Sequence, residues 1–247
     1  PYLSLKELNA NCDLIKQYNI RNVSTTLTFL SHIKDALNNH KVKINTLISY
    51  PFADLPFHFI DEFVSYAKDA GASGIEYIPN FLNLSKNNTN RFASEIESIN
   101  ASELKVTLII NKSKLDKELF TKALEISLEL GITNFQFGDG FGPAISNVDI
   151  VEILKFVGIQ NSIKVVGGIK TLSQVIDFFE PVLEIAKGAR SHGLLNHTSY
   201  YNYLCENTNL SYEISTYMPR LEIIQPCKFE YREKVIYKIP FNWEDDM

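Results

Sequence analysis

The alternation of two kinds of segment along the chain limits its fold more than any other feature. Short runs of β-branched or apolar residues are each followed by a longer segment with helical periodicity. Parallel strands need crossover connections, so this order predicts a parallel sheet wound with helices. Lys105–Ile110 (KVTLII) is largely apolar, as expected of a strand covered on both faces. The predicted strands are Val23–Leu27, Lys43–Tyr50, Ile75–Ile78, Lys105–Ile110, Asn134–Phe137, Ser162–Val166 and Leu183–Lys187.

The segments between these strands carry apolar residues at helical spacing. One of them, Lys114–Leu130, ends at Gly131, a residue type common just after the last turn of a helix. At the start of the chain, Tyr2–Leu5 is predicted as a short first strand and Lys6–Tyr18 as its helix. The other predicted helices are Phe29–Asn38, Pro56–Ala70, Arg91–Ile99, Val148–Val157 and Leu172–Phe179.

Counted in this way, residues 1–203 contain eight strand–helix units. One such unit cannot bury its apolar face alone, and eight of them favour closure into a (β/α)8 TIM barrel, an α/β fold. An open doubly wound sheet is the alternative. Residues 204–247 alternate aromatic or branched residues with charges, most clearly in Lys228–Tyr237. This pattern predicts a C-terminal β-rich extension that packs on the barrel or forms an interface in a homo-oligomer or with a protein partner.

Composition excludes some classes of function. The 247 residues are 45% hydrophobic, enough for a large core, and the net charge of −5 argues against a nucleic-acid partner. No apolar stretch is long enough to span a membrane. The three cysteines form no C-x-x-C pair, so we expect a reducing compartment and a cytoplasmic protein. A location in an organelle is the alternative, because the chain begins at Pro1 and not at a methionine. No metal-ligand spacing or dinucleotide fingerprint occurs, so no cofactor is predicted.

The most informative run for chemistry is Ile163–Thr171 (IKVVGGIKT), since active sites of such barrels lie at the carboxyl ends of the strands. Lys164 is available for acid–base work, and the Gly167 and Gly168 amides can approach a phosphate. A structural, ion-paired Lys164 is the alternative. A charge on an otherwise buried strand is costly without a purpose, which favours a role in the site.

This run resembles the strand V-K-x-x-G-G-I-R-T of deoxyribose-phosphate aldolases. Gly71–Ile78 is similar to that family's G-A-D-E-V-D-x-V, and Leu104–Ile109 to its L-K-V-I-x-E. Gly138–Gly142 is similar to the end of its F-x-K-T-S-T-G-F-G motif. The resemblance covers most of residues 20–190, and only the GGIKT run is specific. It implies a class I aldolase barrel that acts on a phosphorylated sugar.

The resemblance also implies a mechanism. In the family, one lysine forms a Schiff base with the sugar aldehyde, a second lysine lowers the pKa of the first, and an aspartate assists proton transfer. Lys164 matches the second lysine, and Glu76 stands at the aspartate position. Gln136 stands where the Schiff-base lysine is expected, and neither Phe135 nor Phe137 carries an amine.

Two segments that would contact phosphate in the family are less well matched. Lys170 corresponds to an arginine of the family, and a solvated lysine at a helix start is an equal alternative. Lys187 and Gly188 open the loop that stands in place of the family's G-T-S-S-G, and the match there is poor. Asp139 lies in a Gly-Asp-Gly turn, where a side-chain hydrogen bond to the backbone explains it without a catalytic role.

Three hypotheses for function follow. The first is a pseudoenzyme, an aldolase-like barrel that lacks the Schiff-base lysine and acts as a non-catalytic binding or structural protein. The second is an active lyase on 2-deoxyribose 5-phosphate or a related phosphosugar, with Lys164 or Lys187 as the nucleophile. The third is unrelated lyase or isomerase chemistry on the same fold. The Gln136 position and the poorly matched last phosphate loop favour the first hypothesis, whereas Lys164, Glu76 and the GGIKT run favour the second. We expect the first.

Overall fold

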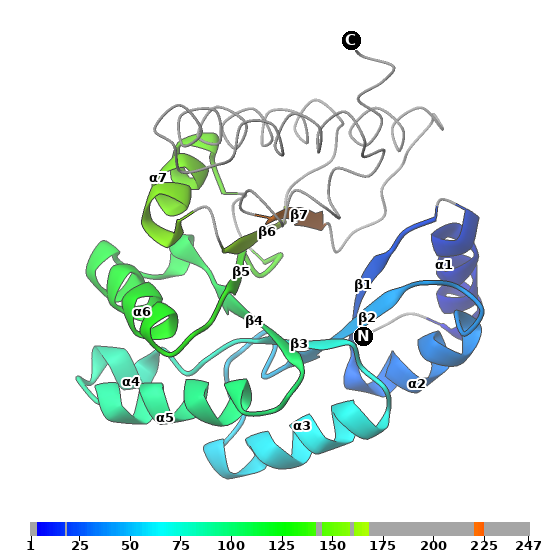
Figure 1. Cartoon of the computed structure of the whole chain (residues 1–247), viewed down its shortest axis with the longest axis horizontal. Coiled ribbons are helices and arrows are strands. Elements are labelled where there is room, and N and C mark those ends of the chain that lie inside the picture. Colours follow the sequence, from blue (N-terminus) through cyan, green and yellow to red (C-terminus); the bar gives the residue numbers. More distant parts are fainter. Residues whose placement is uncertain (1–3, 18, 142–144, 159–160, 168–219, 225–247) are drawn as a thin grey trace, which may run out of the picture. The chain divides into compact units, whose positions relative to one another are not determined.

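The computed structural model describes residues 4–17, 19–141, 145–158, 161–167 and 220–224 (Figure 1). The chain divides into two units, each described below by itself. The first contains residues 1–108 and 125–132, and the second contains residues 109–124 and 133–247.

Four parallel strands form the sheet of the first unit: β1 (Asn22–Thr26), β2 (Lys43–Ile48), β3 (Gly74–Tyr77) and β4 (Lys105–Ile110), the last of which belongs to this unit as far as Leu108. They pair in the order of the sequence, β1 with β2, β2 with β3 and β3 with β4. The strands predicted at Val23–Leu27, Lys43–Tyr50, Ile75–Ile78 and Lys105–Ile110 and their parallel arrangement are therefore confirmed.

Helices cover one face of this sheet in Figure 1. In α3 the buried residues Ile60, Val64 and Ala67 recur at helical spacing and form its inner stripe. The helical segments of the unit are α1 (Leu5–Gln17), α2 (Leu27–Ala36), η1 (Phe57–Phe59), α3 (Ile60–Asp69), α4 (Leu82–Ser85) and α5 (Thr89–Asn100).

The two faces of this sheet differ in polarity, because successive side chains of a strand point to opposite faces. Ile75 and Tyr77 of β3 are fully buried and belong to the apolar face. Glu76, between them, points to the other face, where its register partner on β4 is Thr107. This second face also carries Asn45 of β2, so it is lined by groups that can form hydrogen bonds.

The second unit contains a parallel sheet of β5 (Asn134–Phe137), β6 (Ser162–Val166) and β7 (Arg220–Ile224), paired in that order. The segment after β4 forms η2 (Lys112–Lys114), and α6 (Lys117–Glu129) begins in this unit. Helix α7 (Asn147–Val157) starts with a capping box, in which Ser146 and Asp149 exchange hydrogen bonds. Its buried residues Ile150, Ile153, Leu154 and Val157 form one apolar stripe.

The predicted first strand, Tyr2–Leu5, was wrong in its described part, because Leu5 is the first residue of α1. The Ser4 backbone and hydroxyl both donate to the Glu7 carboxylate, and the Glu7 amide donates to the Ser4 hydroxyl. These hydrogen bonds form a capping box that begins a helix at this point, and the S-x-x-E spacing was a signal for it.

The structure also adds detail near the C-terminus. Strand β7 lies in the region predicted as a β-rich extension, and it pairs in parallel with β6. The predicted helix Leu172–Phe179 and strand Leu183–Lys187 lie outside the described residues, as does the rest of the extension.

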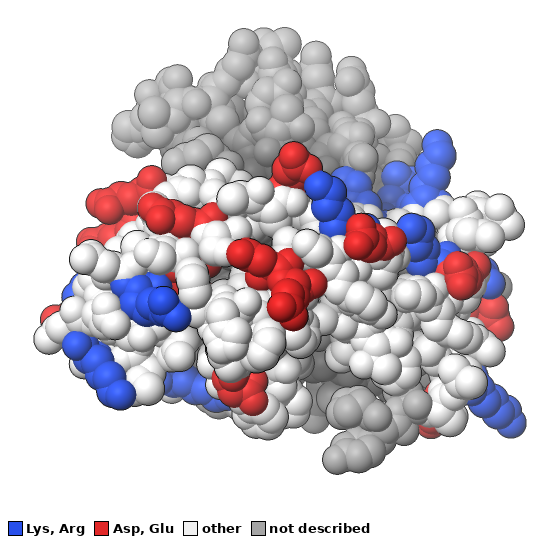
Figure 2. Space-filling view, turned by 90° about the horizontal axis from the view of Figure 1, so that it is seen from below, with Lys and Arg blue, Asp and Glu red and all other residues white. Residues whose placement is uncertain are grey.

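Two surface properties bear on partners. On the face seen in Figure 2, acidic and basic side chains lie interspersed among uncharged ones, in keeping with the net charge of −5. Among the helices that the structure describes, none combines the length and apolar character needed to cross a membrane.

Candidate active site

Gln136 and Lys164, two of the predicted site residues, are neighbours in the sheet of the second unit. They are register partners on β5 and β6, so their side chains leave the same face of the sheet. Adjacent parallel strands are about 4.8 Å apart, which places the two side chains next to each other. Gln136 is 2% exposed and Lys164 is 4% exposed. The structure thus brings a carboxamide and an amine together in a buried position.

The Gln136 carboxamide is anchored at one end. Its Nε2 donates to the Gly138 carbonyl oxygen at 3.0 Å. Its Oε1 has no hydrogen-bond partner, and it is the one buried side-chain nitrogen or oxygen in the described residues with that property. Buried acceptors are normally satisfied, so this oxygen is an exception that a donor from a ligand or a water molecule would remove.

Glycines bring the ends of β5 and β6 into close contact. Gly138 has φ +94°, and a Cβ atom there would lie 2.2 Å from the Val166 carbonyl oxygen. Gly167 has φ +102°, and a Cβ atom on it would lie 3.2 Å from the Gly140 Cα. Gly167, predicted to approach a ligand phosphate, therefore has a structural reason to be glycine as well. The predicted partners Gly168, Lys170, Lys187 and Gly188 lie outside the described residues.

Asp139, in the turn after β5, is held by several donors. Its carboxylate accepts hydrogen bonds from Lys114 Nζ at 2.5 Å and from the Phe141 amide at 2.9 Å. Burial raises the pKa of Asp139, and the hydrogen bonds from Lys114, Phe141 and Asn111 outweigh that effect, so the pKa lies below its ordinary value. The Phe141 contact is the side-chain-to-backbone bond expected in this turn, whereas Lys114 is a partner that sequence reasoning missed.

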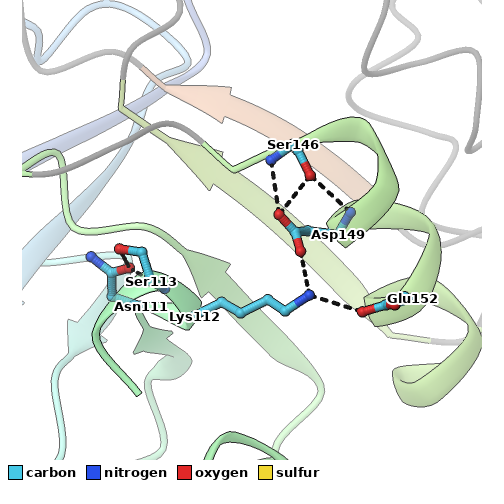
Figure 3. A network of polar contacts seen from close by, with 6 residues as sticks. All are labelled: Asn111, Lys112, Ser113, Ser146, Asp149 and Glu152. Carbon is cyan, nitrogen blue, oxygen red and sulfur yellow. Dashed lines mark hydrogen bonds and ion pairs between the residues drawn. The ribbon is translucent and has the colours of Figure 1, made fainter. Parts of the chain in front are cut away.

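A second polar network fixes the segment that carries Lys114 (Figure 3). Lys112 Nζ donates to Asp149 and, at 2.9 Å, to Glu152, both on α7. Burial lowers the pKa of Lys112, but these hydrogen bonds and the nearby negative charges outweigh it and raise the pKa above its ordinary value. Asn111 caps η2 by accepting from the Ser113 amide at 3.0 Å. The network ties η2 to the start of α7.

We expect the variant Lys112→Met to lower the free energy of unfolding by about 1 kcal/mol, because it removes two partly exposed ion pairs while keeping the apolar stem. Urea denaturation at low and high salt measures this effect, and high salt should shrink it. Lys155→Met, an exposed change on α7, is the matched control. An equal loss in both variants would mean that the ion pairs contribute nothing specific.

Glu76 lies in the first unit, where it is 1% exposed. Its Oε1 accepts hydrogen bonds from Ser24 Oγ at 2.5 Å and from Asn45 Nδ2 at 3.3 Å. Strands β1, β2 and β3 thus each supply one member of this cluster on the polar face of the sheet. A carboxylate held in this way has a fixed orientation, which suits a group that binds or positions a polar ligand.

The opposite face of β3 holds a second buried carboxylate that sequence reasoning missed. Glu95 of α5 accepts hydrogen bonds from the Tyr77 hydroxyl and, at 2.8 Å, from the Asn80 amide. Burial raises the pKa of Glu95 above its ordinary value despite these hydrogen bonds. Burial and the nearby Glu95 charge also raise the pKa of Tyr77. The cluster fastens the segment after β3 to α5.

The raised pKa gives Glu95 a defined effect on stability. Between the ordinary carboxyl pKa, about 4.3, and the higher folded value, the folded state binds more protons than the unfolded state, so stability falls as pH rises. We expect the variant Glu95→Gln to lose this dependence and to gain stability relative to the parent as pH rises through that window. Urea denaturation at several pH values measures this, with the exposed change Glu97→Gln as control. A constant difference between parent and variant would contradict the prediction.

No group of histidine, cysteine, aspartate and glutamate side chains in the described part of the chain is arranged to hold a metal ion. Of the predicted site residues that the structure describes, Lys164 and Gln136 of the second unit and Glu76 of the first carry polar groups suited to chemistry.

The chain as a whole is similar to a class of enzymes. A deoxyribose-phosphate aldolase from Dictyoglomus turgidum is 29% identical over 180 residues, which cover 72% of this chain and 82% of the relative. A family model described as WbmS-like polysaccharide deacetylase matches residues 158–247, a minority of the chain that includes β6 and β7.

Solved structures agree with the sequence match. The aldolase QR15 aligns with a TM-score of 0.68 at 21% identity, over 73% of this chain and 82% of its own. A tetrameric deoxyribose phosphate aldolase from Aeropyrum pernix aligns with a TM-score of 0.64 at 16% identity, over 73% of this chain and 78% of its own. At this level of identity the likeness shows the fold, which is the α/β barrel of the aldolases.

Proposed function

We propose that this chain is a divergent member of the deoxyribose-phosphate aldolase family and that it binds a phosphorylated sugar without forming a Schiff base. The observation that carries the proposal is the buried carboxamide of Gln136 near the end of β5. By resemblance, this position corresponds to the Schiff-base lysine of the family. Schiff-base formation needs a primary amine whose nitrogen lone pair attacks the aldehyde carbon. The lone pair of a carboxamide nitrogen is delocalised into its carbonyl group, so Gln136 cannot replace that amine.

Two retained residues support a sugar-phosphate site, while among the described residues only the Gln136 position favours the absence of catalysis. Lys164 keeps a buried amine beside Gln136, and Glu76 keeps an oriented carboxylate. In this proposal the Gly167 and Gly168 amides and the Lys170 amine contact the phosphate, and Lys187 and Gly188 contribute a second, weaker contact. The chain is then a pseudoenzyme that retains a sugar-phosphate site.

The proposal includes an assembly. One structural relative is described as tetrameric, and we propose that this chain also forms a homo-oligomer. In this proposal residues 1–203 form the barrel, and residues 204–247 form a β-rich extension that packs on it through β7, beside β6, and also reaches the subunit interface.

Borohydride trapping tests the proposed function. The full chain is incubated with 2-deoxyribose 5-phosphate and sodium borohydride, and the product is examined by intact mass. We expect no adduct, beside an active aldolase that is labelled under the same conditions. A stable adduct on the unchanged chain would overturn the proposal.

One observation favours a second candidate, an active lyase with a relocated nucleophile. Lys164 is 4% exposed and is the register partner of Gln136, the position that corresponds by resemblance to the family's Schiff-base lysine, so a relocated nucleophile would stand one strand away from that position. Peptide mapping of a trapped adduct distinguishes the cases. Labelling that the variant Lys164→Met abolishes assigns the chemistry to Lys164, and labelling that persists in this variant directs attention to Lys187.

A further inference from the structure

The oxygen of Gln136 that has no hydrogen-bond partner indicates which chemical group a ligand would place beside it. A buried acceptor without a donor destabilises the folded protein, so such atoms are rare unless a water molecule or a ligand supplies the donor. In the described residues Gln136 Oε1 is buried and has no donor, while the rest of the side chain is held in place.

The orientation of the carboxamide follows from its other hydrogen bond. Carboxamide nitrogen and oxygen are distinguished by their partners. The Gly138 carbonyl oxygen, 3.0 Å from Nε2, can only accept a hydrogen bond. Exchange of the two ends of the carboxamide would place two acceptors against each other, so Nε2 faces Gly138 and the carbonyl end is the one offered to a ligand.

The neighbour on β6 completes the chemical requirement. Lys164, the register partner of Gln136, can donate hydrogen bonds and cannot accept them when it is protonated. A ligand group that reaches both side chains would donate to Gln136 Oε1 and accept from Lys164 Nζ, in addition to the contacts that Lys164 already makes. A hydroxyl group does both, whereas an aldehyde oxygen only accepts and would face the Gln136 oxygen unfavourably.

We infer that the site selects a sugar phosphate with a hydroxyl group at the end of the chain, an alditol phosphate, and that Gln136 is its specificity-determining residue. The inference rests on the proposed function only in that a phosphorylated sugar occupies the site. The terminal hydroxyl of the alditol occupies the position that the aldehyde oxygen of 2-deoxyribose 5-phosphate would occupy. It donates a hydrogen bond to Gln136 Oε1 and accepts one from Lys164.

Isothermal titration calorimetry on the full chain tests the inference with two ligands, 2-deoxyribitol 5-phosphate and its 1-deoxy analogue, which lacks only the terminal hydroxyl. We expect the first to bind about 10-fold more tightly, since one such hydrogen bond is worth roughly 1.4 kcal/mol. In the variant Gln136→Met, which has similar size but no acceptor, the ratio should fall to about 1. The variant Gln17→Met makes the same change at an exposed position and should keep the 10-fold ratio.

The outcomes are separable. Equal affinities on the unchanged chain would mean that water satisfies Gln136 Oε1, and binding of neither ligand would mean that the ligand class is wrong; either result overturns the inference. A ratio that persists in a folded Gln136→Met variant overturns the role of Gln136. Borohydride trapping decides separately whether a Schiff base forms, and the two affinities decide whether the terminal hydroxyl is recognised. If the Gln136→Met variant fails to fold, the affinities of the unchanged chain for the two ligands still test whether the terminal hydroxyl is recognised.

Discussion

Replacing Gln136 by lysine should convert the chain from one that borohydride does not label with 2-deoxyribose 5-phosphate to one that is labelled almost completely. The introduced amine would leave the same face of β5 that Gln136 leaves now, beside Lys164. A neighbouring positive charge lowers the pKa of an amine by about 1–3 units, which increases the fraction of nucleophilic, unprotonated amine near neutral pH. Intact mass and peptide mapping measure the adduct and its position.

The control for the expected labelling introduces a lysine two residues earlier on β5. Asn134 lies on the same strand and face, one rung earlier, and its register partner is Ser162 in place of a lysine. The variant Asn134→Lys should therefore gain little or no labelling. A folded Gln136→Lys variant without an adduct would show that the chain has lost more of the aldolase site than its nucleophile.

The substitution Gly138→Ala should destabilise the chain by about 3 kcal/mol or more, because it combines a strained backbone with a steric clash. Gly138 has φ +94°, and the added methyl group would lie 2.2 Å from the Val166 carbonyl oxygen, a backbone atom that cannot rotate away. Urea denaturation followed by circular dichroism measures the loss.

Gly131→Ala separates the two causes. Gly131 has a similar φ of +81°, but its nearest neighbouring atom, Asn100 Nδ2, would be 3.8 Å from the added methyl group. This variant should lose only about 1 kcal/mol, the cost of the backbone conformation alone. Equal losses in the two variants would contradict the close contact between the ends of β5 and β6.

Strand positions could be predicted wherever local sequence was decisive. The predicted strands Lys105–Ile110, Asn134–Phe137 and Ser162–Val166 have the bounds of β4, β5 and β6. Each is a short apolar or β-branched run bounded by polar residues or glycine, and a strand is the element that such a run can form between two helices. The strand predicted at Tyr2–Leu5 was wrong because the capping residues Ser4 and Glu7 determine the conformation of that segment more strongly than its short apolar run.

The candidate site was less predictable, because its contacts join residues that are distant in sequence. Motif register predicted Gln136 and Lys164, and their pairing on adjacent strands follows once the sheet order is known. Lys114, by contrast, lies on a short helical turn, and only the three-dimensional fold shows that it reaches Asp139. The same holds for Glu95, whose position on an ordinary amphipathic helix gave no sign of its contact with Tyr77.

The pairing of β6 with β7 has a consequence for how the chain reaches its native state. Residues 167–219 separate the two strands, so during synthesis β6 emerges from the ribosome well before its parallel partner. Until Arg220–Ile224 has been made, the backbone amides and carbonyls on that side of β6 lack this partner and are open to association with other chains. Closure over so long a segment is also slow, since non-local pairing carries the entropy cost of a large loop. A fragment that ends at Tyr203 would keep β6 permanently in this state, and aggregation of such a fragment would reflect the missing partner strand.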